Sequence, residues 1–364
     1  MIKTRWTIWL VCVFMLCMPI ISVTHAQTDF ICGVDVSSLT QIESSGGLFY
    51  DENGTHQTDV LAYFQSQGVN TVRLRLWNNP ANGLHNLDYN LALAERIHAL
   101  GMKIFLDFHY SDTWADPAHQ TKPAEWADLS FDELRQAVFD YTSEVMQAFI
   151  AQDTPPAMVQ IGNEITFGML WDDGHITASQ GWSNLTALLN AGIDAIRQTS
   201  PETEVIIHLH TGGDRRLSTW FFDHILNTVD FDIIGLSYYP WWSGRFTQLN
   251  KTITILAYRY GKPILIAETA YPWTFDWADD FHNAVGNPDQ IERGYPATPE
   301  GQHLFLLDLI YHVQQTPENL GVGFVYWESA NITTPQLGSY WENLAQFDFD
   351  GHALPSIRAY HVCQ

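Results

Sequence analysis

The sequence predicts an α/β fold of the (β/α)₈ barrel class, and three observations indicate it. Eight strand-like segments follow one another along the chain, and a helical pattern comes after most of them. No linker or low-complexity tract interrupts the series. Two of the strands, 156–164 and 263–268, are apolar runs that begin with proline and contain a glutamate at their carboxyl end. We therefore expect one domain over residues 27–364.

The first half of the barrel is predicted from alternation and helical spacing. We expect strands over 31–36, 69–77, 103–110 and 156–164, and helices over 59–67, 91–100, 131–151 and 182–198. In the second strand three apolar residues alternate with one threonine and two arginines. An arginine inside a strand is costly unless it is paired. Arg75, near the carboxyl end, is therefore a candidate for holding a carboxylate or a sugar hydroxyl.

The second half repeats the pattern. We expect strands over 205–210, 231–238, 263–268 and 323–328, and helices over 217–226, 249–260 and 303–315. Residues 269–299, rich in Trp, Asp, Asn and Pro, form a long loop of the kind that is usually functional. A doubly wound open sheet is the alternative fold. It normally has a glycine-rich phosphate turn after its first strand, and residues 33–38 do not form one.

Glu164 and Glu268 are the candidate catalytic residues. A parallel barrel gathers the carboxyl ends of its strands on one face, which would bring these two distant glutamates together. Paired carboxylates carry out glycoside hydrolysis. A glutamate after a strand can also be a solvated loop residue, since Glu is seldom buried. The Asn163–Glu164 pair and the matching second strand favour a site.

The histidines are open to more than one interpretation. His109 ends the third strand and is either a core histidine or a site residue, because function gathers on loops above a rigid scaffold. His208 and His210 form a His-x-His pattern that could bind a metal ion. Zinc needs further ligands, and the sequence offers no obvious ones, so we expect no catalytic metal.

Residues 1–26 are predicted to be a signal peptide. Lys3 and Arg5 precede an apolar run over 6–23, and small residues stand before Gln27. A transmembrane anchor is the alternative, but no positively charged flank follows the run. We therefore expect a secreted, extracellular protein. Cys32 and Cys363 remain after cleavage, one near each end, and could form a disulfide in an oxidising compartment.

The charge of the chain limits its partners. Seventeen Lys and Arg against 41 Asp and Glu give a net charge of −24. Such a surface repels nucleic acid, anionic membranes and acidic polysaccharides such as pectate, and is compatible with a neutral polysaccharide. Fourteen tryptophans and 15 tyrosines, several of them after strand ends, offer flat faces on which sugar rings can stack.

Six segments carry a resemblance to a known family. They are Gly33–Ser38, Gly68–Trp77, Phe108–Pro117, Gly162–Glu164, Ser237–Trp242 and Glu268–Pro272. Together they resemble the family 53 glycoside hydrolases, which are arabinogalactan endo-β-1,4-galactanases in the clan of retaining (β/α)₈ enzymes with glutamates on strands four and seven. The segment Asp-Phe-His-Tyr-Ser-Asp-x-Trp-Ala-Asp-Pro is the most specific of these matches.

The resemblance implies roles for named residues. Glu164 would be the acid/base and Glu268 the nucleophile. Asn163 would hold the sugar 2-hydroxyl, Tyr238 would hydrogen-bond the nucleophile, Arg75 would keep it ionised, Trp327 would stack under the sugar and His109 would line the pocket. We expect no required cofactor and a monomer.

Bacterial members of the family can carry a structural calcium ion between the last two long loops. Oxygen ligands are available there from Asp276, Asp279, Asp280, Asn287 and Asp289. The spacing is not that of an EF-hand, and a solvated acidic loop is the alternative.

Together with the predicted signal peptide, the resemblance therefore implies a secreted, retaining endo-β-1,4-galactanase acting on the neutral (arabino)galactan side chains of plant cell-wall pectin. One alternative is another retaining endo-β-glycanase of the same clan, a β-mannanase or β-glucanase. The other is a non-catalytic polysaccharide-binding protein on the same fold, against which the presence of both glutamates counts.

Overall fold

The computed structural model describes residues 29–177 and 179–364. The predicted signal peptide lies outside these residues. Among the helices that are described, none is long and apolar enough to span a membrane.

Eight parallel strands close into a barrel, which confirms the predicted fold class. The strands are β1 (Ile31–Asp35), β4 (Thr71–Leu76), β5 (Lys103–Phe108), β6 (Met158–Ile161), β9 (Glu204–Leu209), β10 (Ile233–Tyr238), β11 (Ile264–Thr269) and β12 (Gly321–Tyr326). Each lies within or close to a strand expected from the sequence. β1 pairs with both β4 and β12, so the sheet has no free edge.

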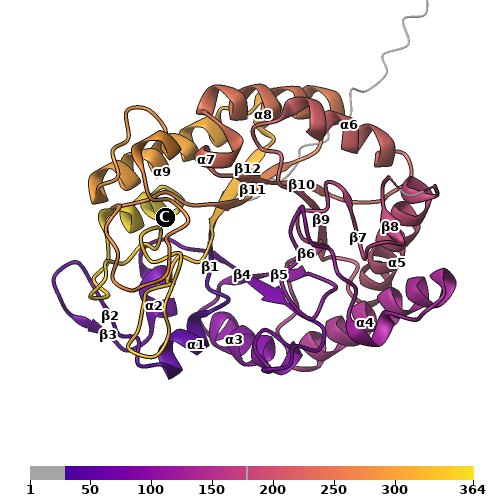
Figure 1. Ribbon diagram of the computed structural model, residues 1–364, viewed down its shortest axis with the longest axis horizontal. Helices are drawn as coiled ribbons and strands as arrows, with labels where there is room; N and C mark the ends of the chain where they lie inside the picture. The colour runs from indigo at the N-terminus through magenta and orange to yellow at the C-terminus, as the bar shows by residue number, and fades with distance from the viewer. Residues whose placement is uncertain (1–28, 178) are drawn as a thin grey trace, which may run out of the picture.

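The helices form an outer ring around the strands (Figure 1). They are α1 (Leu39–Ser44), α2 (Val60–Ser66), α3 (Leu87–Ala99), α4 (Phe131–Ala151), α5 (Gly181–Thr199), α6 (Arg215–Ile225), α7 (Pro240–Ser243), α8 (Phe246–Tyr260) and α9 (Pro299–Gln314). Some begin earlier than expected because of their caps. The side chain of Asn86, for example, accepts a hydrogen bond from the backbone N–H of Tyr89 and starts α3 four residues early.

Elements of two or three residues were not predicted, because so few residues carry no periodicity, and the longer η4 was expected only as a short closing segment. Two small antiparallel sheets pair β2 (Phe49–Tyr50) with β3 (His56–Gln57), and β7 (Gly168–Met169) with β8 (Gly174–His175). Four 3₁₀ segments are η1 (Ala124–Trp126), η2 (Pro288–Gln290), η3 (Pro317–Asn319) and η4 (Pro355–Cys363).

An apolar cluster fills part of the barrel and supports a polar layer. The cluster is Ile31, Phe105, Met158, Ile206, Ile233, Leu265, Ala267 and Val325. Side chains two apart on a strand share a face, so Asp107 lies on the same inner face as Phe105 and nearer the carboxyl end. The guanidinium of Arg73 lies 5.5 Å from the Phe105 ring centroid. Charged groups therefore occupy the barrel interior next to this apolar cluster.

A disulfide joins Cys32 of β1 to Cys363 of η4, which confirms the predicted pairing. The two residues are 331 positions apart in sequence, and their Cα atoms are 6.3 Å apart. The bond ties the last described segment to the first strand of the barrel.

Candidate functional site

Glu164 and Glu268 come together at the carboxyl ends of β6 and β11. The Oγ atom of Ser237, on β10 between them, lies 2.6 Å from Glu164 Oε1 and 3.4 Å from Glu268 Oε2. These two carboxylate oxygens are therefore at most about 6 Å apart, near the separation of about 5 to 5.5 Å that retaining glycosidases use. The convergence expected from the two strands is present.

A sharp turn after β6 aims Glu164 at this point. Gly162 has φ 78° and Glu164 has φ 49°, both in the left-handed region. A Cβ atom on Gly162 would lie 2.5 Å from the side chain of Ile165, so the turn needs glycine here. Non-glycine residues in this conformation gather at functional sites.

Glu268 is held by a cation and a hydroxyl. Its Oε1 lies 2.9 Å from Arg73 Nη2, and its Oε2 accepts a hydrogen bond of 3.0 Å from the Tyr239 hydroxyl. Burial raises the pKa of Tyr239 well above its usual value, so this hydroxyl stays a donor. Both contacts favour the ionised form of Glu268.

The two glutamates differ in how firmly they hold a proton. Burial, followed by the nearby charge of Glu268, raises the pKa of Glu164 to about 8. Burial also raises the pKa of Glu268, but Arg73 opposes this, and the result is about 7. Among the described residues Glu164 has no ion-pair partner within 4.0 Å. Glu164 is thus the better proton donor and Glu268 the better nucleophile.

The tyrosine that contacts Glu268 is Tyr239, so the prediction for Tyr238 was wrong. Side chains alternate along β10, and Ser237 faces the site, so Tyr238 points to the helix side and Tyr239 returns to the site. The Tyr238 hydroxyl donates to the Gly244 carbonyl, and its ring stacks on Phe246.

The arginine that contacts Glu268 is Arg73, so the role that the resemblance implied for Arg75, to keep the nucleophile ionised, was wrong. The expectation that Arg75 holds a carboxylate is confirmed, but that carboxylate is Glu328. Two residues along a strand span about 6.7 Å, so Arg75 lies nearer the carboxyl end of β4 than Arg73 does. There its Nη2 pairs with Glu328 Oε1 at 3.1 Å and contacts His85 Nε2 at 3.2 Å. The face of Trp114 lies over its guanidinium at 4.0 Å.

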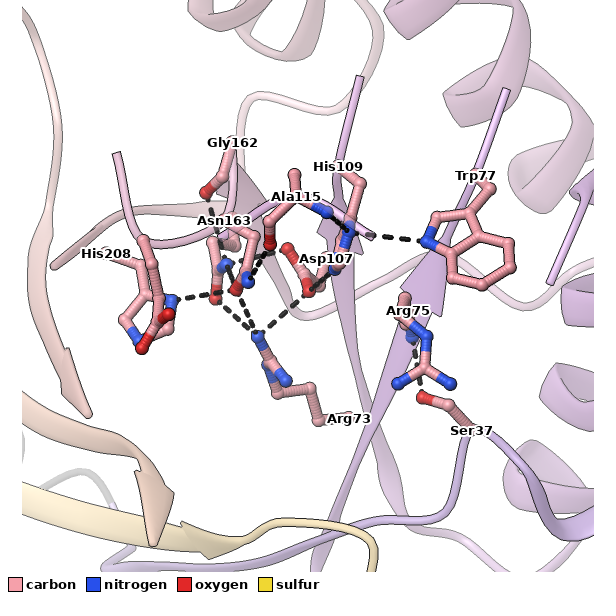
Figure 2. Close-up of polar contacts among 12 residues, drawn as sticks. Ser37, Arg73, Arg75, Trp77, Asp107, His109, Ala115, Gly162, Asn163 and His208 are labelled. Carbon is pink, nitrogen blue, oxygen red and sulfur yellow. Dashed lines mark hydrogen bonds and ion pairs between the residues drawn. The ribbon is translucent and has the colours of Figure 1, made fainter. Parts of the chain in front are cut away.

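Asn163 is fixed between charged and backbone groups (Figure 2). Its Oδ1 accepts hydrogen bonds from Arg73 Nη2 at 3.0 Å and from Gln160 Nε2 at 3.0 Å, while its Nδ2 donates to the Ala115 carbonyl at 2.8 Å. His208 Nδ1 lies 3.1 Å from the same Oδ1. The amide beside Glu164 is therefore held rigidly, with one Nδ2 hydrogen left for a ligand.

His109 is buried and supports the site through its contacts with Asp107 and the backbone of Ala115. It is 2% exposed, its Nε2 lies 3.0 Å from Asp107 Oδ2, and its Nδ1 accepts from the Ala115 N–H at 3.0 Å (Figure 2). Both ring nitrogens are engaged, which differs from the expected role of lining the pocket. Asp107 in turn binds Arg73 at 2.9 Å, so His109 braces the network that holds Glu268.

Trp327 follows β12 and belongs to an aromatic cluster. Its ring packs edge-on against Trp341 at 4.5 Å and lies 5.9 Å from Trp114. Trp327 is 8% exposed, whereas Trp114 and Tyr340 are about two-fifths exposed. Trp114 and Tyr340 therefore offer more aromatic surface to a ligand than Trp327 does.

Several residues of the site were missed from the sequence. They are Asp35, Arg73, Asp107, His208, Ser237, Tyr239 and Glu328. Alternation from Ser237 could have indicated Tyr239. His208 drew attention only as half of a metal pattern, but it contacts Asn163 and Ser237, while His210 contacts Thr166.

The described residues contain no group of three or more His, Cys, Asp or Glu placed to hold a metal ion. In the proposed calcium loop, Asp279 Oδ2 accepts hydrogen bonds from Thr333 Oγ1 and from the Ser339 N–H, both at 2.7 Å. Calcium binding by this loop stays a prediction.

Comparison with known proteins gives consistent matches along the chain. The model of glycosyl hydrolase family 53 matches residues 31–360. The chain is 44% identical over 344 residues to an uncharacterised protein from the bgaB 5′ region of Niallia circulans, covering 92% of this chain and 94% of that one. It is 36% identical over 339 residues to the arabinogalactan endo-β-1,4-galactanase of Thermothelomyces thermophilus, covering 90% and 98%. The solved GH53 catalytic domain of Ignisphaera aggregans superposes with a TM-score of 0.87 at 38% identity, covering 92% and 96%.

Proposed function

Because this chain belongs to glycosyl hydrolase family 53, and is thus a glycoside hydrolase, we propose that it is a secreted, retaining endo-β-1,4-galactanase. Its substrate would be the neutral (arabino)galactan side chains of pectin. The observation that carries the proposal is the pair Glu164 and Glu268. Glu164 Oε1 and Glu268 Oε2 both lie near Ser237 Oγ and are therefore at most about 6 Å apart.

In the first step Glu268 attacks the anomeric carbon and the glycosidic C–O bond breaks. Glu164 gives its proton to the leaving oxygen, and a galactosyl ester forms on Glu268. Arg73 and Tyr239 favour the ionised nucleophile that this attack needs. In the second step water attacks the same carbon from the side of Glu164, which takes the proton of the water as the ester bond breaks. Two inversions give net retention.

Substrate recognition rests on an amide and on aromatic faces. The free Nδ2 hydrogen of Asn163 would donate to the 2-hydroxyl of the sugar next to the cleaved bond. Trp114 and Tyr340 would stack on sugar rings along the cleft. A net charge of −24 suits a neutral polymer better than an acidic one. The substrate named for the Thermothelomyces thermophilus relative supports this choice.

Secretion is supported by the pattern of residues 1–26 and by the Cys32–Cys363 disulfide, since disulfides persist in oxidising compartments. Expression of the full chain in a bacterial host, with N-terminal sequencing of protein from the medium, tests it. We expect the mature chain to begin at Gln27.

The substrate is tested with a panel of linear galactan, arabinose-branched galactan, β-mannan and β-glucan. We expect linear galactan to yield short galacto-oligosaccharides and the last two polymers to remain intact. Cleavage of mannan or glucan without cleavage of galactan would assign the chain to another specificity. Binding of galactan without any product would make it a polysaccharide-binding protein.

A further inference from the structure

The orientation of the Asn163 amide determines which nitrogen of His208 carries a hydrogen. Arg73 can only donate and the Ala115 carbonyl can only accept, so Asn163 Oδ1 faces Arg73 and Nδ2 faces Ala115. His208 Nδ1 lies 3.1 Å from this acceptor oxygen. A hydrogen bond at this distance requires that Nδ1 of His208 carries the hydrogen.

His208 is held in its neutral form. The side chain is fully buried, and Arg73 donates to the same Asn163 oxygen, so a second positive charge would lie beside the first. Burial first, and then Arg73, lower the pKa of His208 well below its usual value, while Asp107 opposes this. The other titratable groups facing the ring are His109 and His210. A neutral ring with hydrogen on Nδ1 leaves a lone pair on Nε2.

Ser237 must then give its single hydrogen to His208. Ser237 Oγ lies 2.8 Å from His208 Nε2, which can only accept. The same Oγ lies 2.6 Å from Glu164 Oε1, and a hydroxyl has only one hydrogen. The hydrogen in the contact between Glu164 and Ser237 must therefore come from Glu164.

We infer that Glu164, as a carboxylic acid, donates to Ser237 Oγ, which donates to His208 Nε2, and that this chain keeps the proton on Glu164. Ser237 and His208 are thus positioning residues. The inference rests on the proposed function only in taking this proton to be the one that the leaving sugar receives. Loss of the proton would leave two acceptors facing each other, or would turn the Ser237 hydroxyl away from a buried nitrogen.

The direction of these hydrogen bonds reverses the usual effect of a serine on the pKa of a neighbouring carboxyl group. A hydroxyl that donates to a carboxylate lowers the pKa of that carboxyl group, whereas a hydroxyl that accepts from the acid raises it. The charged groups around Glu164 are Glu268 and Asp116, which favour its proton, and Arg73, which disfavours it. The Ser237–His208 pair acts in the same direction as Glu268 and Asp116, because it also favours the proton on Glu164.

The test measures the pKa of Glu164 in the free enzyme, by infrared difference spectroscopy of the protonated carboxyl group against Glu164→Gln. Ser237→Ala removes the acceptor, and we expect the pKa of Glu164 to fall by about one unit. A rise would show that Ser237 donates to the carboxylate and would overturn the inference. No change would overturn it as well.

The matched control is Ser218→Ala. Ser218 is also a fully buried serine, but its hydroxyl bonds to Thr211 and Asp214 instead of to the site. We expect this variant to leave the pKa of Glu164 unchanged.

A measurement on the unmodified protein keeps the inference testable if Ser237→Ala does not fold. Nitrogen NMR of labelled histidine reports the tautomer of His208 directly. We expect a neutral ring with hydrogen on Nδ1 at pH 6, and a doubly protonated ring would overturn the inference. Neither readout requires turnover, so failure to cleave galactan would refute the proposed function and leave this result standing.

If galactan is cleaved, the alkaline limb of kcat/KM provides a third readout. It should move to lower pH in Ser237→Ala, in the same direction as the infrared titration.

Discussion

Arg73 and Arg75 lie two residues apart on the same strand and on the same face, yet their surroundings differ. Arg73 pairs with Asp35, Asp107 and Glu268, each at 2.9 Å, so one positive charge meets three negative ones. Within the part of the chain that the structure describes, Arg75 forms an ion pair only with Glu328, and it lies under the face of Trp114. Figure 2 shows Arg73 within the polar network and Arg75 apart from it, next to Ser37.

Burial is the main cause that raises the pKa of Glu268, and the charged groups around Arg73 modify this rise. Asp107 and Asp35 raise its pKa, while Arg73 and the Tyr239 hydroxyl lower it. In the proposed mechanism this balance lets Glu268 attack in its ionised form and still leave the sugar readily. Glu328 is more deeply buried than Glu268, and its partner Arg75 also packs against the ring of Trp114. The first arginine thus contacts the proposed nucleophile, and the second contacts Glu328 and the Trp114 ring.

The largest difference in kcat is expected between variants in which Glu268 or Glu328 is replaced by glutamine, which removes the charge and keeps the shape. Glu268→Gln should lower kcat at least about 10⁴-fold, because the nucleophile is lost. Glu328→Gln should lower kcat by less than about 10-fold, because Glu328 acts only through Arg75 and Trp114. Steady-state kinetics on galactan measures both. Similar losses in the two variants would contradict the separation of roles.

Replacement of Arg73 should lower the free energy of unfolding more than replacement of Arg75 does. Arg73→Met leaves three buried carboxylates without a cation, and we expect it to cost more than the roughly 3 to 5 kcal/mol of one broken buried ion pair. Arg75→Met leaves only Glu328 without its cation, so its cost in unfolding free energy should fall within that range. Urea unfolding at pH 7 gives both values. An Arg75→Met variant that is the less stable of the two would contradict the charge count.

The pKa of Glu164 predicts a stability effect that depends on pH. Since the folded state keeps this proton up to about pH 8, and the unfolded chain loses it near 4.5, stability falls as the pH rises between these values. Glu164→Gln removes this loss. We expect the variant to be more stable than the parent at pH 8, by about 1 to 2 kcal/mol, and about equal at pH 4. Thermal unfolding at the two pH values measures it, and an equal gain at both would contradict the assignment.

The neighbouring tyrosines give the smallest contrast. Tyr239→Phe removes a donor from ionised Glu268, so the acid limb of kcat/KM should move up by about one unit. Tyr238→Phe loses only the bond to the Gly244 carbonyl and should cost about 1 kcal/mol with an unchanged pH profile. A shift in the Tyr238 variant instead would restore the role first predicted for it.

Alternation and strand ends were enough to predict the barrel and the meeting of Glu164 with Glu268, because a parallel barrel gathers those ends on one face. They were not enough for the arginines. Arg73 and Arg75 are two residues apart, so alternation places both side chains on the same face of the strand. Alternation does not show how far along the barrel axis each side chain lies. That position depends on the register of β4 against β5, which the sequence does not show.

His208 was beyond sequence reasoning for a similar reason. Its partners Asn163 and Ser237 come from two other strands, and only the closed barrel brings them together. The Cys32–Cys363 bond could be proposed from the compartment alone, but its geometry required the packing of η4 near β1.

The division of labour between the two glutamates is tested most directly by trapping the sugar on the enzyme. A 2-fluoro-galactoside with a good leaving group slows release of the covalent intermediate, and peptide mapping by mass spectrometry then locates it. We predict one added sugar on the peptide that contains Glu268, and none in Glu268→Gln. A sugar on Glu164 or on Glu328, or release of product with inverted configuration and no adduct, would contradict the mechanism.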